Sequence, residues 1–266
     1  MLREITLGQY YPVESCIHRL DPRTKLFGTL VFLVSLFITD NFYGYIAAVI
    51  FLIAAIKLCK VPFSYMVKGM RAIMVLLMLS VVLNLFLTTG EVIFSFWKLT
   101  ITKEGIYTAG MMAIRLVFLI IGSSIMTLTT TPNNLTDGLE KGLGFLKVIK
   151  VPVHEISMMM SIALRFIPIL MEETDKIMKA QMARGAHFDD KHLIQKVKSM
   201  IPLLIPLFVS AFRRANDLAM AMEARCYRGG EGRTKMKPLK YHRGDAVAYG
   251  CIFAYLAVII VIRILL

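Results

Sequence analysis

Apolar residues are grouped in long blocks along the chain. Residues 26–58 are apolar apart from a polar break at 39–41, and three further apolar blocks cover 72–89, 106–130 and 246–266. A helix needs about twenty apolar residues to cross the hydrocarbon core of a bilayer, so 26–58 is too long for one crossing and is divided at its break. The pattern therefore predicts five transmembrane helices.

Two local signals refine this picture. Asp21 and Pro22 stand just before the first apolar block, where aspartate suits the N-cap and proline the first helical position. Between the third and fourth blocks, residues 90–105 alternate apolar and polar side chains with a period of two. That period predicts a small β-hairpin outside the membrane.

The segment 131–245 differs from the apolar blocks, because it carries 19 Lys and Arg and 12 Asp and Glu. Four basic residues precede the first block and four lie between the second and third, whereas the connection after the third has only Lys98 and Lys103. Basic short connections stay in the cytoplasm, which predicts a cytoplasmic N-terminus and a cytoplasmic 131–245. We therefore expect an all-α, polytopic membrane protein with a membrane domain at 1–130, a cytoplasmic coupling domain at 131–245 and a last span at 246–266.

Composition agrees with a membrane protein. Apolar residues make up 57% of the 266 and charged residues only 18%, which is atypical of a soluble domain. The net charge of +13 is explained by basic segments that face anionic lipid, so no nucleic-acid partner is expected. The four cysteines, at 16, 59, 226 and 251, have no spacing typical of a metal site or a disulfide framework.

Two long amphipathic helices are predicted within 131–245, at about 153–184 and 191–225. Each has an apolar seam with the alternating three- and four-residue spacing of helix packing. The first seam contains Ile156, Met160, Ala163, Ile167, Leu170, Thr174, Ile177 and Gln181. The second contains Leu193, Val197, Met200, Leu204, Leu207, Ala211, Ala215, Leu218 and Met222. Proline at 168 in the first helix, and at 202 and 206 in the second, predicts kinks.

Both helices end in nearly the same tripeptide. The first ends in Ala183, Arg184 and Gly185, and the second in Ala224, Arg225 and Cys226. One explanation is that each arginine complements the negative end of its helix dipole. The alternative is that small neighbours let each helix tip enter a groove of a partner protein, where a guanidinium can bind a carboxylate.

Methionine is also concentrated in this region, with ten of the 18 between residues 151 and 245. Its flexible, polarizable side chain is common on surfaces that accept several partners, and Met159 and Met220 are candidate contacts of that kind. Ordinary filling of a helix interface is the alternative.

Other candidate sites are weaker. Arg115 lies inside the fourth apolar block, where a charge is costly, and it could pair with Asn84, with a backbone carbonyl or with a partner subunit. His187, Asp189, Asp190 and His192 have no standard metal-ligand spacing, so no metal or other cofactor is expected. The chain has no phosphate-binding loop of the GxxxxGK type, and acidic residues are nearly absent from the apolar blocks, so we expect no enzyme.

Five motifs, in this order and spacing, give the chain a family resemblance over nearly its whole length. They are the segments 18–26 (HRLDPRTKL), 129–132 (TTTP), 163–168 (ALRFIP), 180–185 (AQMARG) and 223–229 (EARCYRG). The chain resembles EcfT, the transmembrane coupling component of energy-coupling factor (ECF) transporters, which are ABC-type importers.

The resemblance implies a scaffold in the bacterial cell membrane that is not itself an enzyme. It would bind two cytoplasmic ABC-type ATPases through the tips at Arg184 and Arg225, and cradle a separate, exchangeable substrate-binding S component for a vitamin or a metal ion. Met159, Met220 and Arg115 are the expected contacts with that S component. Cys226 departs from the glycine of the family pattern, which would move the helix cap to Gly229. A self-contained permease with its own substrate site, and a membrane-embedded enzyme, remain the alternatives.

Overall fold

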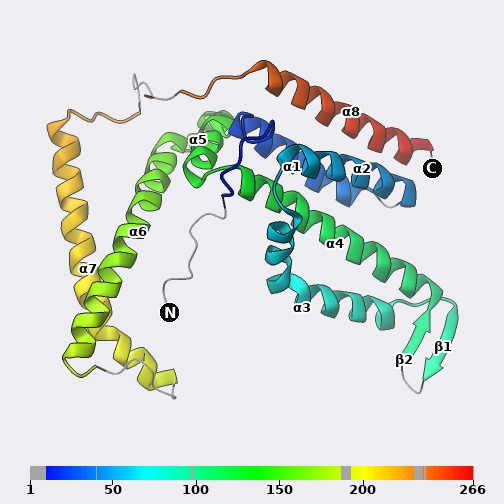
Figure 1. Ribbon diagram of the computed structural model, residues 1–266, viewed down its shortest axis with the longest axis horizontal. Helices are drawn as coiled ribbons and strands as arrows, with labels where there is room; N and C mark the ends of the chain where they lie inside the picture. Colours follow the sequence, from blue (N-terminus) through cyan, green and yellow to red (C-terminus); the bar gives the residue numbers. More distant parts are fainter. Residues whose placement is uncertain are drawn as a thin grey trace. The chain divides into compact units, whose positions relative to one another are not determined.

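The computed structural model describes residues 10–39, 41–96, 99–186, 193–230, 236 and 238–265. Within these ranges the regular structure is helical apart from one hairpin, and the chain divides into two compact units (Figure 1). The core unit contains the described residues of 8–141 and 239–266, and the α6–α7 unit contains those of 142–238. The elements of the core unit are α1 (Pro22–Ile38), α2 (Phe42–Cys59), α3 (Phe63–Leu87), β1 (Val92–Phe96), β2 (Leu99–Thr102), α4 (Lys103–Thr129), α5 (Pro132–Gly142) and α8 (Arg243–Leu265).

The buried interior of the core unit lies among α1, α2, α4 and α8. Leu36 of α1, Ala48 of α2 and Ile121 of α4 belong to one buried apolar cluster. Gly28 lets α1 approach α8 closely, because a Cβ there would lie 2.8 Å from Cδ1 of Ile252. Helix α3 packs along α4, so these five helices form one packed set.

Some polar groups inside this set bond to one another across helices. Ser35 of α1 and Tyr255 of α8 share a hydrogen bond of 2.7 Å between their hydroxyl groups, and both residues are buried. The Tyr255 ring also stacks on Phe51 of α2, with 4.4 Å between ring centroids. One aromatic side chain therefore joins three helices.

The predicted all-α polytopic class is confirmed, and so is the hairpin, which is the antiparallel pair β1 and β2. Asp21 is the N-cap of α1 and Pro22 its first residue, as predicted. The set of candidate spans differs from the predicted five. Among the described residues, length and hydropathy identify α2, α4, α6 and α8, with residues 73–87 of α3 as a shorter apolar helix. Helix α1 has 17 residues, about 26 Å in length.

The α6–α7 unit consists of η2 (Gly144–Ile149), α6 (Val153–Ala183) and α7 (Leu193–Ala224). Pro168 lies inside α6 without ending it, and Pro202 and Pro206 lie inside α7, which bends along its length in Figure 1. Helix α6 lies in the segment predicted to be cytoplasmic, yet one window of it meets the length and hydropathy of a span. Its charges are confined to the C-terminal half apart from Glu155 and Arg165, which leaves an apolar first half.

The predicted domains, 1–130, 131–245 and 246–266, separate the chain by side of a membrane, and that division stays a prediction. The two compact units are instead defined by which residues pack together. Residues 132–141 of α5 group with the core unit, because Gly138 packs against Pro22 of α1.

Candidate coupling site

The C-terminal end of α6 is closed by a Schellman motif. The Gly185 N–H donates to the Met182 carbonyl and the Ala186 N–H to the Gln181 carbonyl, both at 3.0 Å. Gly185 has φ +88°, the left-handed conformation that this motif requires at its closing position. Arg184 is the C-cap residue, so the predicted glycine cap is present and the arginine stands at the helix tip.

The end of α7 repeats this arrangement bond for bond. The Cys226 N–H donates to the Glu223 carbonyl at 2.8 Å, and the Tyr227 N–H donates to the Met222 carbonyl at 3.0 Å. Arg225 therefore occupies the same position as Arg184, one residue before the left-handed residue. The repeated tripeptide in the sequence is a repeated cap in the structure.

The expectation that the cap of α7 would move to Gly229 is wrong. Cys226 itself takes the left-handed conformation, with φ +56°, while Gly229 has φ +89° three residues further on and closes no bond of the motif. The two hydrogen bonds hold Cys226 in a conformation that costs a residue with a Cβ about 1–2 kcal/mol. The exposed tip leaves room for the side chain.

Both tips are exposed over all three residues, 183–185 and 224–226. Within the ranges that the structure describes, neither the Arg184 nor the Arg225 guanidinium forms a hydrogen bond or an ion pair. The caps are made by backbone groups, so the arginine side chains are not needed to hold them. Five N–H donors on each exposed guanidinium remain available to a carboxylate.

The two helices pack antiparallel, which sends the tips in opposite directions. Arg214 of α7 donates to Glu173 of α6 at 3.0 Å, and Gly230, just beyond α7, lies against the His154 ring at the start of α6. Figure 1 shows α6 and α7 running in opposite directions, and Arg184 is the C-cap of α6. With 31 residues, α6 is roughly 45 Å long.

The packing face was predicted in part for each helix: the C-terminal half of the predicted α7 seam faces α6, whereas Met200 and Leu204 of that seam are exposed. Ala211, Ala215, Leu218 and Met222 of the predicted α7 seam line an apolar groove against α6. On α6 the groove is lined by Ile162, Phe166 and Leu170, of which only Leu170 belongs to the predicted seam. Exposed Ala163 shows that the α6 seam is rotated by one position, because 162, 166 and 170 follow a strict spacing of four.

Met159 of α6 and Met220 of α7 lie outside this groove, with exposed fractions of 58% and 60%. They are not fillers of the α6–α7 interface. A further apolar face runs along α7, where seven large side chains are exposed at successive turns: Met200, Ile201, Leu204, Ile205, Phe208, Val209 and Phe212. The unit therefore presents apolar surface as well as two basic tips.

Arg115 of α4 has partners within the core unit. Its Nε donates to the Tyr45 hydroxyl at 2.8 Å and one terminal nitrogen to the Thr39 carbonyl at 3.0 Å. Thr39 is the C-cap of α1, so the guanidinium stabilises the negative end of that helix. Asn84 donates instead to the Ser80 carbonyl. Of the expected partners, the backbone carbonyl is confirmed, and contact with an S component stays a prediction.

Comparison with known proteins identifies the family. The CbiQ family model, described as "Cobalt transport protein", matches residues 13–236. An energy-coupling factor transporter transmembrane protein EcfT from Clostridium kluyveri is 53% identical over 266 residues, covering 99% of this chain and 98% of its own. The chain belongs to the EcfT family. EcfT proteins of the same description from Thermosediminibacter oceani and Bacillus subtilis are 54% and 46% identical, each over more than nine tenths of both chains.

EcfT membership confirms the resemblance drawn from the five motifs. The relatives are named as transmembrane proteins of ECF transporters, and the candidate spans of this chain agree with a membrane component of a transporter. None of these names indicates a catalytic activity.

The weak metal candidate at His187, Asp189, Asp190 and His192 lies outside the described residues. Among the described ones, no group of three or more His, Cys, Asp or Glu side chains is placed to hold a metal ion. Sequence reasoning missed Asp245, which is almost fully buried beside Asp21. Its signal was weak: an acidic residue directly before the last predicted span, where it suits the positive end of the helix.

Proposed function

We propose that this chain couples two cytoplasmic ABC-type ATPases to a separate substrate-binding S component, so that ATP binding and hydrolysis drive uptake across the bacterial cell membrane. The duplicated helix tip carries this proposal. Helices of 31 and 32 residues end in the same cap with the same exposed arginine, and they point in opposite directions. Two equivalent tips in one chain suit two equivalent partners.

Each tip would bind one ATPase. The small residues beside each arginine allow a helix end to enter a groove, and a guanidinium without an internal partner can form two parallel hydrogen bonds to a carboxylate there. Ala183 and Gly185 flank Arg184, and Ala224 and Cys226 flank Arg225. Because the cap fixes the backbone, little conformational freedom is lost on binding.

The S component would lie against the exposed apolar faces that include Met159 and Met220. Methionine adapts to several partners, which suits a subunit that serves exchangeable S components. The family model names cobalt, whereas the names of the relatives print no substrate, so we assign the choice of a vitamin or a metal ion to the S component.

A self-contained permease is the second candidate, and it needs unengaged polar groups within several spans. The two strongest polar residues there are engaged within the chain: Asn84 with Ser80, and Arg115 with Tyr45 and Thr39. This observation favours the coupling role over a permease.

Charge reversal at each tip tests the proposal. With Arg184→Glu or Arg225→Glu, we expect at least about tenfold weaker copurification of one ATPase with the tagged chain, because a glutamate repels an acidic groove. Lys179→Glu is the matched control, because it reverses an exposed charge on α6 about one turn before the tip. Retention of both ATPases by both tip variants would refute the docking role.

A further inference from the structure

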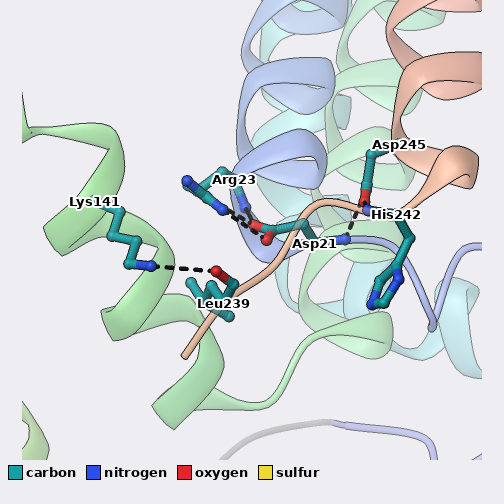
Figure 2. A network of polar contacts seen from close by, with 6 residues as sticks. All are labelled: Asp21, Arg23, Lys141, Leu239, His242 and Asp245. Atoms are coloured by element: carbon teal, nitrogen blue, oxygen red, sulfur yellow. Dashed lines mark hydrogen bonds and ion pairs between the residues drawn. The ribbon is translucent and has the colours of Figure 1, made fainter. Parts of the chain in front are cut away.

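Within the part of the chain that the structure describes, the chain passes between its two units twice, and both passages leave the core unit at one place. The first follows Lys141 and the second precedes Leu239. These residues are 98 positions apart, yet Lys141 Nζ donates a hydrogen bond of 3.3 Å to the Leu239 carbonyl. Figure 2 shows the end of α5 beside the extended segment that leads into α8.

Both passages rest on the start of α1. On the α5 side, Gly138 meets Pro22, where an added Cβ would lie 2.9 Å from the proline ring. On the other side, the Tyr241 ring lies under the Arg23 guanidinium, 3.9 Å from its carbon to the ring centroid. A glycine contact and a cation–π contact thus bring the two connections to consecutive residues of one helix turn.

Asp21 and Arg23 hold this turn rigidly. The guanidinium donates from Nε and from a terminal nitrogen to the two Asp21 oxygens, at 3.0 and 2.9 Å, and the Arg23 N–H donates to the same carboxylate. Burial raises the pKa of Asp21, but the hydrogen bonds and charge of Arg23 outweigh it and hold that pKa below its usual value. The carboxylate is therefore ionised at neutral pH.

Asp245 joins α1 to α8. Its side chain is almost fully buried, and one oxygen accepts from the Asp21 N–H at 2.8 Å while the other accepts from the His242 N–H at 2.7 Å (Figure 2). His242 directly precedes α8, so the carboxylate satisfies backbone donors at the starts of two helices at once. Its negative charge also suits the positive ends of both helix dipoles.

We propose that Asp21, Arg23, Lys141, Tyr241 and Asp245 form an anchor that fixes both connections of the α6–α7 unit to the core unit, with Asp245 as its positioning residue. This proposal rests on the coupling function and deepens it. Connections held at one rigid place pass a movement of the α6–α7 unit to α1 and α8. Without the anchor, the two connections would move with the α6–α7 unit, and α1 and α8 would stay in place.

The first test measures how tightly the units are held. Cys226 and Cys251 are exposed and lie in different units, so both accept spin labels once exposed Cys16 is replaced by serine. In the full chain in lipid nanodiscs, Lys141→Met and Asp245→Asn should each widen the distribution of label distances, by about twofold for Asp245→Asn. Glu14→Gln, which removes the exposed Arg19–Glu14 ion pair of the same region, should leave it unchanged.

The second test measures transport in the reconstituted complex with both ATPases and an S component. Asp245→Asn leaves one buried N–H without an acceptor, so substrate taken up per ATP hydrolysed should fall about tenfold while ATP hydrolysis continues. Lys141→Met should show a smaller fall in the same direction. Lys141 is exposed, so Lys141→Met should fold even if Asp245→Asn does not. Its uptake per ATP hydrolysed then still tests the anchor.

Unchanged distance distributions in both variants would overturn the anchor. Wider distributions of label distances with unchanged uptake per ATP would show that the anchor does not pass movement of the α6–α7 unit to α1 and α8. If the tip variants at Arg184 and Arg225 bind both ATPases normally, the coupling function itself fails. If those tip variants lose an ATPase and the anchor variants behave like the parent chain, only the anchor fails.

Discussion

The core unit has an interior of its own, whereas the α6–α7 unit consists mainly of surface. In the core unit, Leu36 and Ala48 are fully buried among four helices. In the α6–α7 unit, α6 buries only Val153 and Ser157, and Leu203 is the buried apolar residue among the described side chains of α7. A two-helix pair leaves most side chains exposed, so the second unit depends on partners or lipid to cover its apolar faces.

The charges follow the same division. Arg115 and Asp245 of the core unit bond to groups on other helices, and these bonds hold helix ends together. Arg184 and Arg225 of the α6–α7 unit are exposed and have no internal partner among the described residues. Arg115 is therefore structural, whereas the two tip arginines are available for recognition.

Truncating a leucine in each unit should give the largest contrast. Leu36→Ala in α1 leaves a cavity among packed helices and should lower the free energy of unfolding by about 2–3 kcal/mol. Leu204→Ala in α7, where the side chain is 51% exposed, should cost less than about 0.5 kcal/mol. Thermal unfolding of both variants in detergent checks this, and equal losses would contradict the division between the units.

Removing one arginine from each unit should give the next largest contrast. Arg115→Leu deprives the Thr39 carbonyl and the Tyr45 hydroxyl of a charged donor, which should cost about 1.5–3 kcal/mol. Arg165→Leu on the exposed side of α6 is the matched control and should change stability by less than about 0.5 kcal/mol. If the two variants unfold at the same temperature, Arg115 is not the helix-capping residue that its contacts indicate.

The two tips should respond in opposite directions to exchange of the left-handed residue. Cys226→Gly should stabilise the end of α7 by about 1 kcal/mol, because glycine adopts φ +56° without strain. Gly185→Ala should destabilise the end of α6 by a similar amount, although its Cβ would meet open space. Hydrogen exchange at Tyr227 and Ala186, whose N–H groups close the two caps, measures both changes; slower exchange at both would contradict the shared cap.

The smallest effect on stability is expected at the exposed methionines, where the informative readout is a cross-link. Cysteines at positions 159 and 220 should change the free energy of unfolding by less than about 0.5 kcal/mol. In the assembled complex they should form cross-links to the S component. Labelling by lipid reagents without any such cross-link would refute this part of the proposal.

The contrast between the units also explains what the sequence could predict. Hydropathy located the apolar helices, and the Asp21–Pro22 signal located the start of α1, because both depend on neighbouring residues. Asp21 and Asp245 meet across 224 positions, and Arg115 meets Tyr45 across 70, so no local pattern could pair them.

The site was predicted in part for the same reason. The repeated tripeptide predicted two equivalent tips, since a cap is made within six residues. The rotation of the α6 seam was missed because it depends on contacts with α7. The cap of α7 was predicted at Gly229 and not at Cys226, because glycine adopts the left-handed conformation most easily. In the structure the two hydrogen bonds of the motif hold Cys226 in that conformation.

The double variant Arg184→Glu/Arg225→Glu tests the central claim most directly. The complex with both ATPases and an S component is reconstituted in liposomes, and uptake per ATP hydrolysed is compared with that of Lys179→Glu. The coupling account predicts that the double variant loses uptake through failed assembly or through hydrolysis without transport, while Lys179→Glu keeps it. Assembly and uptake at the parent level in the double variant would contradict the account.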